Sequence, residues 1–144
     1  MTTIRTARSY DAPAIAALCG ELGYPSTRQQ MVKRLAAIDG NADCRVFVAE
    51  DAEGCVIAWL QVALAAQLCD DACAEVTGLV VAQPMRGQGI GGQLLVEAEA
   101  WARTRGAQQI RVRSRQEREL AHQFYERAGY ARTKTQLVFG KPLA

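Results

Sequence analysis

The chain lacks any long run of apolar residues and carries almost no net charge. Its 17 basic residues stand against 15 acidic ones, which leaves a formal charge of +2. This balance creates no positive field that would hold nucleic acid, and no segment approaches the roughly 20 apolar residues of a membrane span. The amino end, residues 1–5, also lacks the apolar core of a signal peptide. We expect a cytoplasmic protein that binds neither nucleic acid nor membrane.

Histidine is nearly absent, and the cysteines follow no recognisable pattern. The single histidine, His122, lies far in the sequence from Cys69 and Cys73, the one closely spaced cysteine pair. A structural zinc site needs four ligands at characteristic spacings, so we expect no metal. The five cysteines form an odd set without the spacing of a disulfide framework. Free thiols are typical of a reducing compartment, which agrees with a cytoplasmic location.

The length and the periodicity of the apolar residues predict one α/β domain over residues 1–144. A chain of 144 residues buries a core of its own, and no repeat or linker interrupts it. Period-2 and apolar runs predict strands at 4–8, 46–49, 56–60, 75–81, 110–115, near 130 and at 136–139. Helical spacing with caps predicts helices at 12–18, 27–38, 90–105 and 117–128. The expected order is β-α-α-β-β-β-α-β-α-β-β, a mixed α/β architecture.

A glycine-rich segment, Arg86-Gly87-Gln88-Gly89-Ile90-Gly91, connects the apolar strand at 75–81 to the longest predicted helix. Glycines let the backbone approach a phosphate closely, and the free N–H groups and dipole of a helix start attract an anion. A nucleoside-triphosphate loop would need Lys and then Ser or Thr after its last glycine. Here Gly92 is followed by Gln93-Leu94, so that class of ligand is excluded.

The same segment formally matches the dinucleotide pattern G-x-G-x-x-G, and its surroundings argue against that match. In a dinucleotide fold the glycines follow the strand directly, and an acidic residue about 20 residues later binds the ribose. Here Pro84 and Arg86 intervene, and residues 109–113 carry no acid. A phosphate ligand of another class is expected.

The pattern Arg/Gln-x-x-Gly-x-Gly/Ala, with the apolar strand before it and the Phe124-Tyr125 helix after it, resembles the GNAT family of N-acetyltransferases. The resemblance implies a mixed, mostly antiparallel central sheet with a splayed parallel pair, and acetyl-CoA as the cosubstrate. It also implies that loop amides bind the pyrophosphate and that the end of the strand lies along the pantetheine arm. The coenzyme contacts that it implies are Leu79, Val80, Val81, Arg86, Gly87, Gln88, Gly89, Ile90, Gly91, Gly92, Ala121, Phe124 and Tyr125.

The resemblance also implies roles in the chemistry, which is direct attack of a primary amine on the thioester in a ternary complex. Tyr125 matches the tyrosine that protonates the departing thiolate, and the Leu79 backbone N–H would stabilise the oxyanion. Glu75 matches the general-base glutamate of one branch, whereas other members remove the proton through water. Arg118 departs from the family, in which asparagine is frequent at this position.

The acceptor is left open by the sequence. The family resemblance places the acceptor beside the first two helices, where Glu21, Leu22 and Tyr24 are candidate contacts. Acidic residues such as Glu75 would attract a cationic amine, and small molecules and peptides both remain candidates. A homodimer is expected from the family, with contact through the last strand. The alternative is an inactive module that binds acetyl-CoA as a sensor.

Overall fold

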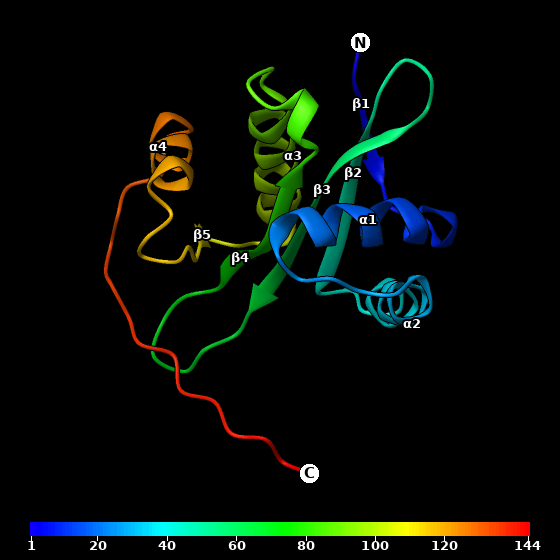
Figure 1. Cartoon of the computed structure of the whole chain (residues 1–144). Coiled ribbons are helices and arrows are strands. Elements are labelled where there is room, and N and C mark those ends of the chain that lie inside the picture. The colour runs from blue at the N-terminus through cyan, green and yellow to red at the C-terminus, as the bar shows by residue number, and fades with distance from the viewer. The chain divides into compact units, whose positions relative to one another are not determined.

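A computed structural model describes all residues from Met1 to Ala144. The contacts within the chain divide it into two units, Met1–Arg113 and Ser114–Ala144. Figure 1 gives the path of the chain and the labels of its helices and strands.

The first unit is built on a five-stranded sheet with the order β1-β2-β3-β4-β5. The strands are β1 (Thr3–Thr6), β2 (Cys44–Glu50), β3 (Val56–Ala65), β4 (Cys73–Val81) and β5 (Gln109–Val112). All neighbours are antiparallel except β4 and β5, which are parallel. The sequence prediction of a mixed, mostly antiparallel sheet with one parallel pair is therefore confirmed.

The helices of this unit begin and end where the local sequence indicates. They are α1 (Ala12–Leu22), α2 (Arg28–Asp39) and α3 (Ile90–Thr104). Gly23 ends α1 with a φ of 96°, a left-handed conformation that glycine adopts without a steric penalty. Thr27 starts α2 with a capping box, in which Thr27 and Gln30 bond to each other's backbone N–H. None of the helices has the length and apolar composition needed to cross a bilayer.

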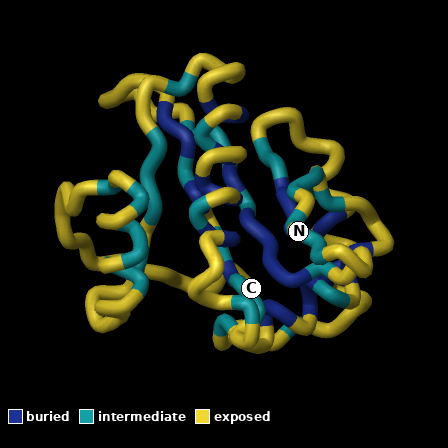
Figure 2. Tube along the Cα trace, turned by 90° about the horizontal axis from the view of Figure 1, so that it is seen from above, coloured by how far each residue is buried: buried dark blue, intermediate teal, exposed yellow.

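Helices cover both faces of the sheet. α1 and α2 pack on the face that carries Val48, Trp59 and Val80, and α3 packs against β2, β3 and β4 on the other face, as Figure 1 shows. Because side chains alternate along a strand, Leu60 faces α3, and its side chain is completely buried. In Figure 2 the buried segments follow the central strands between the helix layers.

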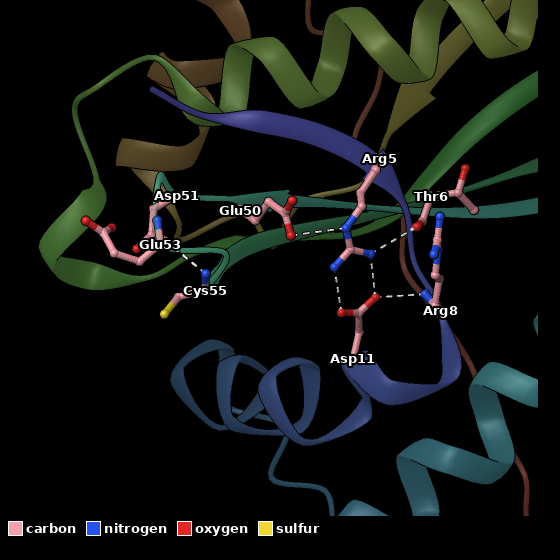
Figure 3. A network of polar contacts seen from close by, with 8 residues as sticks. All are labelled: Arg5, Thr6, Arg8, Asp11, Glu50, Asp51, Glu53 and Cys55. Carbon is pink, nitrogen blue, oxygen red and sulfur yellow. Dashed lines mark hydrogen bonds and ion pairs between the residues drawn. The ribbon is translucent and has the colours of Figure 1, made fainter.

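One buried charge, Asp11, joins the start of α1 to the sheet (Figure 3). Its carboxylate accepts hydrogen bonds from the Arg5 guanidinium at 2.8 and 2.9 Å and from the Arg8 backbone N–H at 2.7 Å. Burial alone would raise the pKa of Asp11, but the Arg5 and Arg8 hydrogen bonds outweigh it and lower the pKa. Arg5 also donates to Glu50 of β2 at 3.1 Å. The network therefore fixes β1, β2 and the first helix together.

The second unit contains a single helix, α4 (Glu119–Arg127), which Gly129 follows with a φ of 96°. The prediction of a helix at 117–128 is confirmed, but the two strands predicted near Tyr130 and at 136–139 are wrong, because residues 130–144 form neither helix nor strand. A strand needs a hydrogen-bonding partner, and residues 136–139 are paired with no other strand. Their apolar side chains, Leu137, Val138 and Phe139, are exposed.

Candidate functional site

The glycine segment forms an open loop between β4 and α3. β4 ends at Val81, and a single 3-10 turn, Gln83–Met85, turns the chain toward the helix. Gly87 and Gly89 both have a φ of 82°, a conformation that costs an L-residue roughly 1–2 kcal/mol. The positions of these two glycines therefore follow from the backbone path of the loop.

The loop leaves a row of backbone donors unpaired. None of the N–H groups from Gly87 to Gly92 donates to a carbonyl of the protein, and the first bond back into the helix is from Gln93 to Gly89 at 3.1 Å. A Cβ atom placed on Gly87, Gly89 or Gly92 would meet no heavy atom within 4 Å, so no side chain or backbone of the protein packs against these three glycines on that side. Unpaired N–H groups at a helix start are suited to a phosphate.

Arg86 and Glu21 lie together at the base of this loop. The Arg86 Nε donates to the Val81 carbonyl at 2.9 Å, and one of its Nη atoms lies 3.9 Å from the Glu21 carboxylate. The same Glu21 oxygen accepts the Gln83 backbone N–H at 3.0 Å. Arg86 was predicted to contact coenzyme and Glu21 to contact the acceptor; in the structure Arg86 joins the loop to β4, and Glu21 joins it to α1.

A β-bulge in β4 precedes the loop. Gly78 pairs with Gln61 and Val76 pairs with Val62, so Thr77 is an extra residue in the ladder. The bulge is accompanied by a close approach, because a Cβ atom on Gly78 would lie 2.6 Å from the Trp59 ring. The sequence interpretation missed this feature; the only signal was a glycine in the middle of an apolar strand, which often marks a bulge.

The second half of β4 has a free edge. The parallel pairing with β5 runs from Cys73–Gln109 to Val76–Val112 and stops there. Beyond it, the edge of β4 that includes Leu79, Val80 and Val81 has no strand beside it on the β5 side. Unpaired strand edges offer backbone N–H and C=O groups to a partner. Backbone groups of successive residues point to opposite edges of a strand. The bond from the Ala82 N–H to the Ile57 carbonyl shows that Val80, two residues earlier, faces β3, so Leu79 and Val81 direct their backbone groups to the free edge.

Glu75, the predicted general base, is paired with two arginines. Its Oε1 atom accepts hydrogen bonds from the Nε of Arg111 at 2.9 Å and of Arg113 at 2.7 Å. Burial would raise the pKa of Glu75, but the hydrogen bonds from Arg113 and Arg111 outweigh it and hold the pKa below its ordinary value. A carboxylate with a lowered pKa binds a proton weakly, which makes it a poor general base.

Leu22 and Tyr24, predicted to contact the acceptor, lie at the carboxyl end of α1. Leu22 is half-buried against the core formed by α1 and α2, whereas the Tyr24 side chain is exposed. The Tyr24 backbone N–H bonds to the Cys19 carbonyl at 3.0 Å as the helix ends. Both residues therefore lie on the α1 and α2 side of the sheet.

The predicted acid, Tyr125, lies in the second unit on α4. Its ring packs edge-on against Phe124 and Tyr130, with ring centres 5.1 and 6.1 Å apart. Burial raises the pKa of the Tyr125 hydroxyl, and the charge of Arg118 opposes that rise only in part. The hydroxyl is therefore protonated at neutral pH, the state that a general acid requires. Ala121 lies one helical turn before Tyr125 on the same helix.

Comparisons of the sequence and of the structure with known proteins point to the same family. The model of the acetyltransferase (GNAT) family matches residues 13–130. An aminoalkylphosphonate N-acetyltransferase from Salmonella typhimurium is 50% identical over 56 residues, which are 39% of this chain and 36% of that protein. The matched segment thus spans about a third of the curated relative.

Solved structures of acetyltransferases share the fold over nearly the whole chain. Glucosamine-6-phosphate N-acetyltransferase from Arabidopsis thaliana has a TM-score of 0.83 and 18% identity, with 100% of this chain and 99% of that one covered. AAC(6')-Iy in complex with the bisubstrate analogue CoA-S-monomethyl-acetylneamine has a TM-score of 0.87 and 16% identity, with 99% of each chain covered. Identities this low establish the fold alone. Together with the family model over residues 13–130, they lead to one conclusion: the chain belongs to the acetyltransferase (GNAT) family.

Proposed function

We propose that this protein transfers an acetyl group from acetyl-CoA to a primary amine by direct attack in a ternary complex. The observation that carries the proposal is the row of unpaired N–H groups from Gly87 to Gly92 at the start of α3. These donors suit the coenzyme pyrophosphate. The membership of the family and the CoA-based ligand of AAC(6')-Iy support the same donor.

In this proposal the free edge of β4 holds the rest of the coenzyme. The backbone groups of Leu79 and Val81 bond to the pantetheine arm, Val80 is a further coenzyme contact, and the Leu79 N–H stabilises negative charge on the thioester oxygen. A backbone N–H held by a sheet is already oriented when the charge develops, and one such donor contributes about 10²–10³ in rate. The absence of a β5 partner beyond Val76 supports this use of the edge.

Two proton transfers remain. An alkyl ammonium has a pKa near ~10.4, so the amine must lose a proton before it attacks. We assign that transfer to water, since the arginine-bound Glu75 has a lowered pKa. Tyr125, whose pKa is raised by burial, is the proposed acid that protonates the thiolate of CoA. Ala121 and Phe124 of the same helix are retained as coenzyme contacts by resemblance to the family.

The acceptor is proposed to be a small primary amine, with Leu22 and Tyr24 among its contacts. The similar proteins act, by their names, on an aminoalkylphosphonate and on glucosamine 6-phosphate. We further propose that the two units form one catalytic domain, because the family match at residues 13–130 includes both. The reaction is placed in the cytoplasm, in keeping with the free thiols of all five cysteines.

A homodimer is also proposed. Leu137, Val138 and Phe139 expose a continuous apolar segment, and such a patch commonly marks a contact between proteins. Size-exclusion chromatography with light scattering tests it, and a monomer at micromolar concentration would contradict it.

The test of the activity measures CoA thiol released from acetyl-CoA with a panel of primary amines. Tyr125→Phe is expected to lower kcat about 10²- to 10³-fold with little change in the KM for acetyl-CoA, whereas Tyr10→Phe, which removes the hydroxyl of an exposed tyrosine, serves as the control. Acetyl-CoA binding without release on any amine would indicate a sensor module. No binding of acetyl-CoA would contradict the assignment of the loop.

A further inference from the structure

Three charged side chains gather at the point where β4 and β5 separate. Glu75 pairs in register with Arg111 of β5, and Arg113 follows directly after that strand. Glu75 lies opposite Ala63 of β3. Trp59, four residues before Ala63, faces α1 and α2; because strand side chains alternate, Ala63 and Glu75 point to the same face. The three charges therefore lie on the face that α1 and α2 partly cover.

The cluster carries excess positive charge. Two guanidinium groups share one carboxylate oxygen, each through its Nε. The Nη atoms of Arg113 have no partner within the protein, and its side chain is 56% exposed, against 22% for Arg111. Glu75 thus fixes the orientation of Arg113 while leaving the outer edge of its guanidinium available. A guanidinium oriented in this way binds phosphonate and phosphate oxygens through two parallel hydrogen bonds.

The cluster lies close to the proposed reaction centre. Val112 pairs with Val76, so Arg113 is level with Thr77, and Leu79 lies two residues further along β4, about 7 Å away. The intervening residue on the α1 and α2 face is Gly78, which has no side chain to block the path. A short amine whose acid group is a few bonds from its nitrogen spans that distance.

We propose that Arg113, oriented by Glu75 and supported by Arg111, binds the phosphoryl oxygens of the acceptor, so that the preferred substrates are small amines bearing a phosphonate or phosphate group. Arg113 is then a specificity-determining residue, and Glu75 is a positioning residue. This inference rests on the proposed acetyl transfer. It deepens that proposal by naming the charge that the acceptor carries.

The experiment compares 2-aminoethylphosphonate with its diethyl ester, which keeps the amine and the skeleton but lacks the negative charge. CoA release is measured for the wild type, Arg113→Gln, Glu75→Gln and Arg103→Gln. Arg103 is an exposed arginine near the end of α3, on the opposite face of the sheet. It lies about 20 Å along the helix from the loop, and its replacement removes the same charge as Arg113→Gln.

The wild type is expected to prefer the phosphonate over the diester. Arg113→Gln should raise the KM for the phosphonate about 10- to 100-fold, as expected for the loss of a charge-assisted hydrogen-bond pair, and leave the diester unchanged. Glu75→Gln should raise the KM for the phosphonate several-fold and leave kcat on the diester unchanged. Arg103→Gln should behave as the wild type.

Three results would overturn the inference. The first is equal use of both amines by the wild type. The second is a raised KM for acetyl-CoA, rather than for the phosphonate, in Arg113→Gln. The third is a kcat lowered about 10²-fold or more on both amines in Glu75→Gln, as loss of a general base would give. In each of these cases acetyl transfer itself stands. If the wild type releases no CoA with either compound or with the amine panel, the proposed function fails as well.

Discussion

Replacing Gly78 with alanine should push β4 away from the buried Trp59 ring. An added Cβ would lie 2.6 Å from Cη2 and 2.7 Å from Cζ3 of that ring, well inside the optimal carbon–carbon separation of about 3.5–4.0 Å. The ring has little room to retreat, because Trp59 is only 8% exposed and packs within the core beneath α1 and α2. Either the ring or the bulged strand must shift.

The expected cost follows from two opposing effects. Overpacking a well-packed core costs about 1–3 kcal/mol, while replacing glycine with alanine stabilises a compatible backbone by about 0.4–1 kcal/mol through the unfolded state. Gly78 has no positive φ, so no backbone strain is added. The net loss should be about 1–2 kcal/mol, measured as the free energy of unfolding in urea.

Gly20→Ala is the matched control. Gly20 lies within α1, and a Cβ there would meet nothing within 4 Å. Alanine is favoured over glycine inside a helix by about 0.5–1 kcal/mol, so the same chemical change should now stabilise the protein. Opposite signs for the two variants would separate the steric clash from any general effect of alanine.

A second substitution tests the cause. Trp59→Phe removes the outer ring atoms that meet the added Cβ, and also removes an indole N–H that is buried without a hydrogen-bond partner. In a double-mutant cycle, Gly78→Ala should lower the free energy of unfolding markedly less in the Trp59→Phe background than in the wild type. The coupling energy between the two substitutions should be about 1 kcal/mol or more. A cost for Gly78→Ala near zero in the wild type, or an equal cost in both backgrounds, would refute the reasoning.

Three further substitutions test other parts of the structure. Asp11→Asn should lower the free energy of unfolding by about 3 kcal/mol at neutral pH, because a buried charge pair is broken. The pKa of Asp11 is lowered in the folded state, so its contribution to stability is present above the unfolded pKa of ~3.9 and is lost as the pH falls through the folded pKa. The difference in stability between variant and wild type should therefore shrink in acid. A difference that stays constant with pH would contradict the pairing. Gly89→Ala should raise the KM for acetyl-CoA at least about 10-fold, because roughly 1–2 kcal/mol of backbone strain would displace the loop. Gly106 has a similar φ of 78° outside the loop, so Gly106→Ala should lose comparable stability and keep the wild-type KM. Equal KM values in the two variants would contradict a role of the loop in coenzyme binding. Thr27→Ala should cost about 1 kcal/mol by breaking the capping box, measured by thermal unfolding, and an unchanged melting temperature would show that the cap contributes nothing.

Local rules predicted most of the elements. A cap at Ser26 or Thr27, and glycines at a helix end, are short-range signals that act within one turn, and the structure has α1 and α2 where these signals place them. The glycine loop was also accessible from the sequence, because Gly87 and Gly89 take a backbone conformation that few other residues adopt.

These local rules could not predict which strands pair with each other, or in which register. The bulge at Thr77 depends on the register between β3 and β4, and the free edge of β4 depends on where β5 stops. The prediction of a strand at 136–139 was wrong for the same reason, because a run of apolar residues indicates burial but does not indicate which strand it would pair with. In each case the missing information is the identity of a neighbour far away in the sequence.

The charge at the candidate acceptor site shows how far such pairing changes a chemical conclusion. Read along the sequence, Glu75 is an acid that favours a cationic amine; read across the parallel pair of strands, it is bound to Arg111 and Arg113. Because opposite charges in contact largely cancel each other's field at a distance, the unshared part of the cluster determines what an approaching substrate meets. That part is the outer edge of Arg113. The proposed substrate preference therefore depends on the β4–β5 register rather than on the charge balance of the whole chain.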